Sequence, residues 1–452
     1  MTRIDPDARQ RAGHAFLVAS AIGAANTANA RRPIKRTGRA GVLGFFPGWL
    51  TSELPLHAIA WQVLATAIFA RRGALRTGRG RLGLLVSVAS WAGLVKVWKQ
   101  SLEAGEVYDA ALREGLGDAL DAVRPGEVPA PPSVGLDHRR IVAGPLARWK
   151  RRYVHGPSIR YGDAGRRNEL DVWKRPDLAL DAKAPVLVQV HGGAWVIGNK
   201  EQQALPLLAH MAERGWVCVS INYRLSPRAT WPDHIVDVKR ALAWVKANIA
   251  DHGGDPDFVC ITGGSAGGHL SSLAALTANE PAFQPGFEDA DTSVVAAVPF
   301  YGVYDLTNRD GTGRADMDGM LERLVLKASR TDAFDVWEQA STMSWVSHDA
   351  PPFFVIHGQN DSLVPVEQAR SFVAMMRAAS PNPVAYAELP GAQHAFEVFD
   401  SPRTLFTSGA VHRFLEAVRI EAGHGLGRIE EPAAPAEVGD EPVSQVETAL
   451  AD

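Results

Sequence analysis

From about residue 155 onward, short apolar runs alternate with longer stretches whose apolar residues recur at helical spacing. Near-continuous apolar strands that alternate with helices are typical of a parallel sheet covered by helices on both faces. We therefore predict an α/β domain over 155–423 with a mostly parallel eight-stranded sheet. The predicted strands are 158–161, 168–173, 184–190, 216–223, 258–261, 294–301, 352–357 and 384–389.

Three stretches flank or interrupt this alternation. Residues 306–348 insert polar and helical sequence between two strands. Residues 105–154 read as helix and then as a proline-rich break, and we assign them to a cap linker. Residues 424–452 are acidic, rich in proline and alanine, and lack aromatic residues, so we expect this tail to be disordered.

The N-terminal part of the chain has a different pattern. Residues 1–41 predict a helix around 14–30 followed by a basic segment. A cleaved signal peptide ending near Ala30 is an alternative, but Arg9 and Arg11 and the weak apolar content favour a retained amphipathic helix. Residues 42–104 contain two apolar runs, 54–70 and 82–95, which predict a hydrophobic helical hairpin as an extension of the α/β domain.

Three arrangements of this hairpin remain open. Its runs are close to the shortest length that spans a bilayer, so the segment 42–100 could cross a membrane, lie on it, or pack on the α/β domain. The arginine-rich loop between the runs favours the cytoplasmic side, whereas the basic segment before residue 42 argues for the opposite orientation. The expected location is therefore membrane-associated or cytoplasmic.

Composition narrows the possible partners. The formal net charge is −3, which excludes the large basic surface expected of a nucleic-acid-binding protein. The two cysteines, Cys218 and Cys260, both lie in predicted strands. We interpret them as core residues rather than as a disulfide or a metal pair.

The sequence around Ser265 carries the strongest chemical signal. Gly263, Ser265 and Gly267 form a G-x-S-x-G motif between a predicted strand and a predicted helix. This context is that of a nucleophile elbow, in which a tight turn exposes the serine and the following helix directs its N–H groups towards it. A plain glycine-serine turn is the alternative.

A serine nucleophile needs a base that a third group orients, and in this type of fold the acid precedes the histidine. Asp361 follows the strand 352–357, and His394 follows the last strand. We predict that they are the acid and the base, with Asp305 as the second choice for the acid. His357 and His269 are interpreted as structural residues.

Catalysis at an acyl group also needs N–H groups that face the developing oxyanion. Ala266 follows the serine, and the small-residue loop after the strand 184–190 contains Gly193 and Ala194. We predict that these three N–H groups form the oxyanion hole. His191 at the start of the loop is expected to brace it.

The chain resembles the hormone-sensitive-lipase-like esterases and lipases (bacterial family IV) of the α/β-hydrolase superfamily. The resemblance covers about 155–420 and rests on the motifs 191–195, 223–227 and 263–268, on Asp361, and on 391–396. It implies a serine carboxylester hydrolase without metal or organic cofactor, with a cap built from N-terminal helices and the insertion. Two positions depart from the family pattern: Ala194 replaces a frequent glycine, and Gly264 replaces a frequent acidic residue.

These observations predict hydrolysis of short- to medium-chain acyl esters, or of a lipid substrate, through Ser265, Asp361 and His394. An amidase or formamidase with the same triad is one alternative. A non-catalytic small-molecule receptor on the same fold is another, although all three triad positions are filled. A fourth interpretation makes the N-terminal half a membrane anchor or partner platform. Substrate, topology and oligomeric state do not follow from the sequence.

Overall fold

Eight strands form one sheet in the order β1-β2-β4-β3-β5-β6-β7-β8. The structure is a computed structural model, and it describes residues 5–34, 39–123 and 152–423. β2 runs antiparallel to both of its neighbours, and the other pairs are parallel, so the predicted mostly parallel sheet is confirmed. The strands are β1 (Val154–Arg160), β2 (Glu169–Trp173), β3 (Ala184–Val190), β4 (Val217–Ile221), β5 (Gly254–Gly264), β6 (Ala296–Phe300), β7 (Phe353–Gly358) and β8 (Val384–Leu389).

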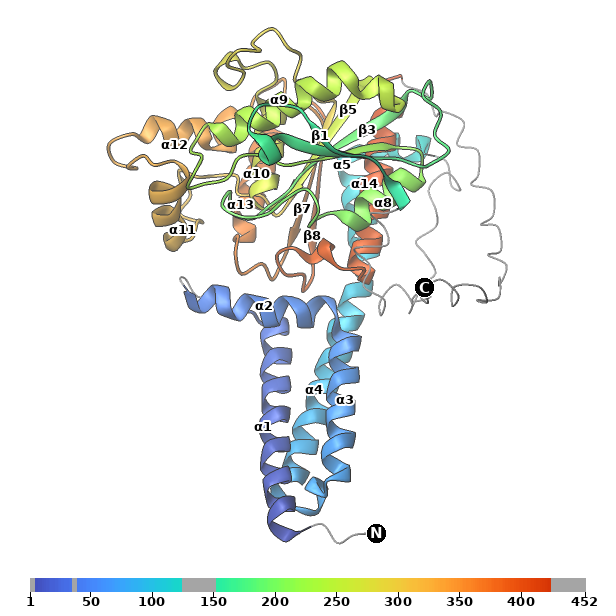
Figure 1. Ribbon diagram of the computed structural model, residues 1–452, viewed down its shortest axis with the longest axis vertical. Helices are drawn as coiled ribbons and strands as arrows, with labels where there is room; N and C mark the ends of the chain where they lie inside the picture. Colours follow the sequence, from blue (N-terminus) through green and yellow to red (C-terminus); the bar gives the residue numbers. More distant parts are fainter. Residues whose placement is uncertain (1–4, 35–38, 124–151, 424–452) are drawn as a thin grey trace, which may run out of the picture.

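Helices cover both faces of this sheet (Figure 1). Alternate strand residues face opposite cores: Val186 and Val188 contribute to one, and Leu187 to the other. Cys218 and Cys260 are buried and free, as predicted. The first core is completed by α9 (Asp233–Asn248), α10 (Ala266–Leu276) and α13 (Val366–Ala379), and the second by α5 (Ala104–Leu116), α8 (Leu205–Glu213) and α14 (Pro402–Glu421).

The insertion between β6 and β7 is helical. It contains α11 (Ala315–Met320), the π-helical turn η6 (Leu321–Val325) and α12 (Phe334–Ala340). Trp231 ties the insertion to the start of α9, because its backbone N–H donates to the carbonyl of Val325 and its indole N–H to Gln339, both at 2.9 Å. The segment assigned to a cap linker begins with α5 and η2 (Gly117–Ala122), which pack against β8 and α14. The rest of that segment, and the tail predicted to be disordered, lie outside the described residues.

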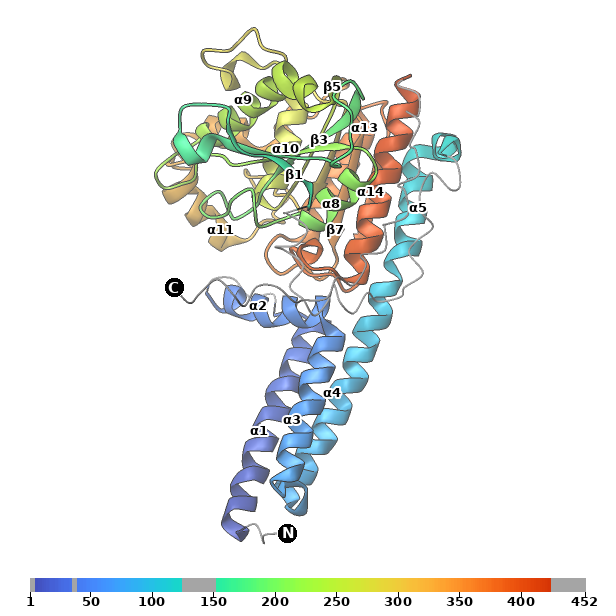
Figure 2. The same cartoon turned by 45° about the vertical axis from the view of Figure 1, so that its right-hand side comes forward.

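A stalk of three helices projects from the α/β domain (Figures 1 and 2). It consists of α1 (Pro6–Arg31), α3 (Pro55–Arg71) and α4 (Gly78–Leu102), and the short helix η1 (Ala74–Arg76) joins the last two. α3 and α4 contain the two apolar runs of the sequence, and α1 is the third helix of the stalk. α4 leads directly into α5, so the stalk enters the α/β domain through a nearly continuous helical axis.

Most buried residues of the stalk are small or polar, and Phe16, Leu94 and Val97 are the large apolar exceptions among its described residues. The hydroxyls of Ser20 and Ser87 are 2.9 Å apart, and those of Thr27 and Ser90 are 2.8 Å apart. Gly83 allows α4 to approach α1 closely, since a Cβ there would lie 3.2 Å from the Cα of Leu17. α1 is therefore a helix as predicted, but it buries a small and partly polar face instead of the apolar face of an ordinary amphipathic helix.

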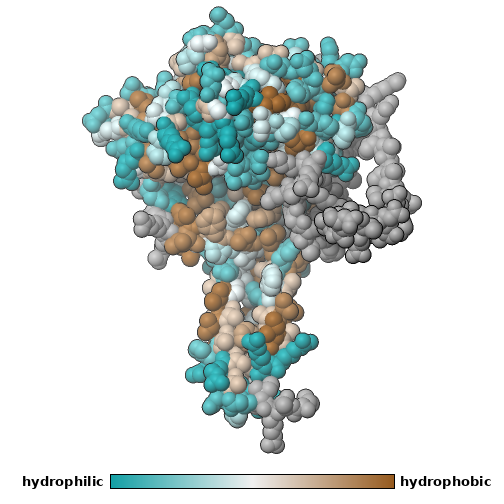
Figure 3. Space-filling model, in the orientation of Figure 1, coloured by the Kyte–Doolittle hydropathy of each residue, from teal (hydrophilic) through white to brown (hydrophobic). Residues whose placement is uncertain are grey.

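The exterior of the stalk is apolar. Large hydrophobic side chains are exposed over much of its length, and the end distant from the α/β domain is hydrophilic (Figure 3). These exposed side chains are Val18, Ile22, Trp61, Val63, Leu64, Ile68, Leu82, Leu85, Val88 and Val95. One helical axis, Gly78–Asp121, is long and apolar enough to cross a membrane, and only 28% of its apolar window is buried. A core helix of a soluble protein would be mostly buried.

A further helix, α2 (Arg39–Glu53), lies across the top of the stalk beneath the α/β domain (Figure 1). It contains Pro47, and the chain turns by 95° between α2 and α3. The sequence pattern did not predict this helix. It is held against both parts of the molecule, because the side-chain amide of Asn29 donates to the carbonyl of Gly44 and the indole of Trp49 donates to the carbonyl of Ala395.

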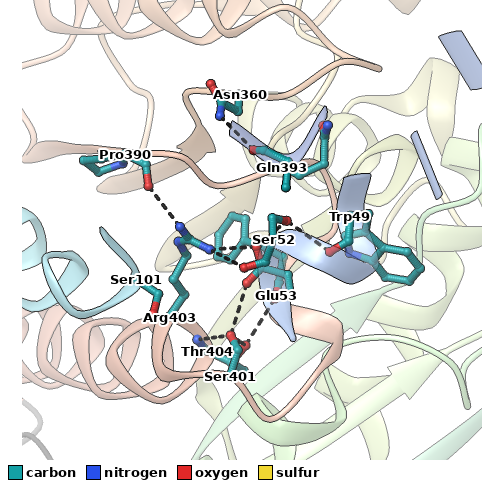
Figure 4. A network of polar contacts seen from close by, with 12 residues as sticks. Trp49, Ser52, Glu53, Ser101, Asn360, Pro390, Gln393, Ser401, Arg403 and Thr404 are labelled. Carbon is teal, nitrogen blue, oxygen red and sulfur yellow. Dashed lines mark hydrogen bonds and ion pairs between the residues drawn. The ribbon is translucent and has the colours of Figure 1, made fainter. Parts of the chain in front are cut away.

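A buried ion pair fixes the end of α2 to the α/β domain (Figure 4). Arg403 of α14 contacts Glu53 at 2.9 Å, and both side chains are almost fully inaccessible to solvent. The hydroxyl of Ser401 donates to the same carboxylate, and the guanidinium of Arg403 also donates to the carbonyl of Pro390. The network therefore joins the end of α2 to the loop that follows β8.

Candidate active site

Ser265 lies in a strained turn between β5 and α10. Its backbone has φ 59° and ψ −120°, a conformation that non-glycine residues rarely adopt. The turn depends on Gly267, because a Cβ at that position would lie 2.1 Å from the carbonyl oxygen of Val190. The backbone N–H of Ser265 donates to the carbonyl of Phe300 at 3.0 Å, which anchors the turn to β6. This is the strand–turn–helix context of a nucleophile elbow.

The predicted acid and base meet at the same edge of the sheet. His394 Nδ1 donates to Asp361 Oδ2 at 2.7 Å, and both side chains are buried. The other carboxylate oxygen accepts the backbone N–H groups of Leu363 and Val364. Burial favours a higher pKa for Asp361, but the charge of His394 and hydrogen bonds from His357 and His394 outweigh it and hold this pKa well below its ordinary value of 3.8. The aspartate is therefore ionised at neutral pH.

Gln393 joins the two loops that carry this pair. Its side-chain oxygen accepts the backbone N–H of Ser362 at 2.7 Å and that of His394 at 2.9 Å. The amide thus fixes the acid loop relative to the base loop. Gln393 was not predicted from the sequence. Its position next to His394 is the only feature of the sequence that could have suggested this role.

Tyr301 connects the base to the serine turn. Its ring centroid lies 4.4 Å from that of His394, and a Cβ at Gly264 would lie 2.6 Å from its hydroxyl. That hydroxyl donates to the buried carboxylate of Glu397, whose pKa is raised above its ordinary value because of burial. The absence of a side chain at position 264 therefore leaves room for a tyrosine–glutamate pair. Neither member was predicted from the sequence.

The loop after β3 lies beside the serine. A Cβ at Gly192 would lie 3.1 Å from the Cβ of Ser265. Among the residues that the structure describes, the backbone N–H groups of Gly193, Ala194 and Ala266 make no hydrogen bond to a backbone carbonyl. Gly193 has φ 120°, and a Cβ there would lie 2.1 Å from the carbonyl oxygen of Ile197, so only glycine fits. These donors are suited to an oxyanion.

The other predicted polar residues lie in structural networks. His191 stacks on Tyr223, whose hydroxyl donates to the carbonyl of His191, and this contact supports the loop after β3. His269 bonds the carbonyl of Ala340 and accepts the indole N–H of Trp195. Asp305, the second choice for the acid, is paired with Arg309 and Thr307.

Buried histidines make the free energy of unfolding depend on pH. Burial lowers the pKa of His191 and that of His269 to about 4 from an ordinary 6.5. Between these values the unfolded chain binds protons that the folded chain does not, so stability must fall as the pH falls from 6.5 to 4. We predict a loss on the order of several kcal/mol in the free energy of unfolding over this range, measured by urea titration.

A pair of variants tests the assignment. His269→Gln should reduce this pH dependence by the contribution of one histidine, whereas replacing the exposed His348 by glutamine should leave it unchanged. A free energy of unfolding that is the same at pH 7 and pH 4.5 in the unmodified protein would contradict the prediction.

Comparison with known proteins identifies the family. The family model BD-FAE matches residues 170–376. The chain is 51% identical to the probable carboxylic ester hydrolase LipM of Mycobacterium tuberculosis, over 89% of this chain and 93% of that protein. It is 46% identical to the esterase LipQ of the same organism, over 87% of this chain and 89% of the relative.

A solved structure with the same fold is esterase 2 of Thermogutta terrifontis phosphonylated by sarin. It is 25% identical, with a TM-score of 0.51, over 60% of this chain and 95% of that one. The chain therefore belongs to the family of carboxylic ester hydrolases that includes LipM and LipQ, and it has the α/β-hydrolase fold. The resemblance to the hormone-sensitive-lipase-like esterases implied the same family.

Proposed function

We propose that the enzyme hydrolyses lipid-soluble acyl esters of short to medium chain length, with Ser265 as nucleophile, His394 as base and Asp361 as the group that orients the histidine. The observation that carries this assignment is the 2.7 Å hydrogen bond between His394 and Asp361 at the sheet edge where Ser265 occupies its strained turn. An aspartate that stays ionised stabilises the imidazolium that forms when His394 accepts a proton.

The reaction proceeds in two acyl-transfer steps. The Ser265 hydroxyl attacks the ester carbonyl carbon as its proton passes to His394, and the N–H groups of Gly193, Ala194 and Ala266 hold the oxyanion. Collapse of the intermediate breaks the bond to the alcohol, which leaves with the proton from His394. Water then attacks the acyl-enzyme, gives its proton to the same histidine, and releases the acid and the free serine.

The proposal includes membrane association through the stalk. Hydroxyl groups of its helices pair in the interior, and most of its large apolar residues are exposed, unlike a helix bundle in water. Basic residues gather at the end distant from the α/β domain, where Arg11, Arg71 and Arg72 line one hollow. Arginines at such a position suit the anionic head groups of a lipid surface.

A fluorophosphonate probe tests the nucleophile. We expect the probe to label Ser265 and to block turnover of p-nitrophenyl esters in proportion to labelling, since organophosphorus reagents react with activated serines. Peptide mapping by mass spectrometry identifies the labelled residue. A label on another residue, or full esterase activity in the labelled protein, would overturn the assignment.

Matched substrates separate the alternatives. The ester and the anilide of the same acyl group should differ in kcat/KM by at least a hundredfold in favour of the ester. Comparable values would favour an amidase. Binding of both compounds without turnover would favour a receptor.

A further inference from the structure

Helix α2 separates the triad from the apolar surface of the stalk. One side of the helix faces the α/β domain, and the other is exposed. The inner side reaches the base directly, because the ring centroid of Phe45 lies 6.2 Å from that of His394. Trp49 donates to the carbonyl of Ala395 at 2.8 Å and packs on Phe399 at 4.7 Å. α2 therefore covers one side of His394 and of the residue that follows it.

The outer side of α2 presents three large apolar side chains at positions i, i+3 and i+7. Leu43 is 74% exposed, Phe46 is 53% exposed and Leu50 is 46% exposed. Side chains with this spacing lie on one face of a helix. Removing apolar side chains from water is favourable, so this exposed face favours an apolar environment.

The apolar surface of the stalk continues this face. The chain turns by 95° between α2 and α3, so α2 lies across the stalk axis where the stalk meets the α/β domain (Figures 1 and 2). Figure 3 shows hydrophobic surface both at the level of α2 and along the stalk. The exposed Trp61 and Leu64 of α3 belong to this surface. An apolar helix that lies across the end of an apolar bundle has the arrangement of a helix in a membrane interface.

We propose that α2 lies in the membrane interface and that the acyl ester reaches Ser265 from the bilayer past α2. This inference rests on the proposed function. The partner of the exposed face is the lipid surface, because the face is continuous with the stalk and because the arginines lie at the opposite end of the stalk, about 25 Å away along the 17 residues of α3. That length is close to the roughly 30 Å hydrocarbon thickness of a bilayer.

The test uses the full-length protein in vesicles of phosphatidylcholine and phosphatidylglycerol. p-Nitrophenyl decanoate dissolved in the bilayer is compared with p-nitrophenyl acetate in water. We expect Leu43→Glu to lower turnover of the decanoate at least fivefold and to leave turnover of the acetate within twofold. Leu180→Glu is the matched control, because Leu180 is 65% exposed on the α/β domain, and it should leave both rates within twofold.

A fluorescent label reports where α2 lies. Both native cysteines are buried, so a polarity-sensitive thiol reagent will react selectively with Leu43→Cys or with Leu180→Cys. Brominated lipid should quench the label at position 43 and not the label at position 180. A label at position 43 that is shielded from water-soluble quencher but unaffected by brominated lipid would identify a protein partner and overturn the proposal.

The outcomes separate this inference from the proposed function. Equal losses on decanoate and acetate in Leu43→Glu would overturn delivery from the bilayer while esterase activity stands. Failure of the unmodified enzyme to hydrolyse either ester would overturn the proposed function itself.

Discussion

Replacing Ser265 by alanine is expected to lower kcat for p-nitrophenyl butyrate by about 10⁴- to 10⁶-fold. The variant keeps the N–H groups of Gly193, Ala194 and Ala266, so substrate binding and part of the oxyanion stabilisation remain. It removes the covalent route, and water must then attack the ester directly. KM should therefore change far less than kcat, as steady-state kinetics on full-length protein will measure.

Ser271 provides the matched control for this variant. It lies on the same helix, and its hydroxyl donates to the carbonyl of Gly268, so Ser271→Ala changes one local contact without touching the turn at Ser265. Its turnover should stay within about threefold of the unmodified enzyme. If Ser265→Ala kept more than a tenth of the activity, another nucleophile would have to be sought.

The second large effect is on stability. Arg403→Met should destabilise the fold by about 3–5 kcal/mol, because it leaves the carboxylate of Glu53 buried without its charged partner. The double variant with Glu53→Gln should recover part of this loss, since no unpaired charge then remains buried. Chemical denaturation of the detergent-solubilised protein measures both values.

An exposed ion pair serves as the comparison. Arg370 contacts Glu388 at 2.6 Å, but about half of the arginine side chain is accessible to solvent. Arg370→Met should therefore cost no more than about 1 kcal/mol. Equal effects of the two arginine replacements would show that burial of the Glu53–Arg403 pair has no energetic consequence.

The sheet could be predicted because its signals are local. β3 and β8 coincide with the predicted strands 184–190 and 384–389, since apolar runs are visible in a few neighbouring residues. The first strand was predicted as 158–161, whereas β1 runs over Val154–Arg160. Its irregular pairing with β2 sets those bounds, and single-sequence patterns do not contain the register.

The site was predictable only in part. Motif order was enough to select Ser265, Asp361 and His394 as candidates, because each follows the end of a strand. The Tyr301–Glu397 pair joins residues that are 96 positions apart, and no periodicity relates them. α2 was not predicted because Pro47 and the glycines around it argue against a helix. The contacts of its Phe45 with His394 and of its Trp49 with Ala395 supply the tertiary support that such a sequence needs.

The axis that runs from α4 into α5 gives the molecule a mechanical property. Gly78–Asp121 is one helical path of 44 residues, about 66 Å long at the usual rise per residue. Its last part packs against β8 and α14, inside the second core of the enzyme. Only Glu103 separates α4 from α5, and α5 belongs to the second core, so we expect the stalk and the hydrolase to move together. We therefore expect the height of Ser265 above the base of the stalk to vary little. Its encounter with substrate should then depend on diffusion of the whole molecule and not on rotation of a tethered domain.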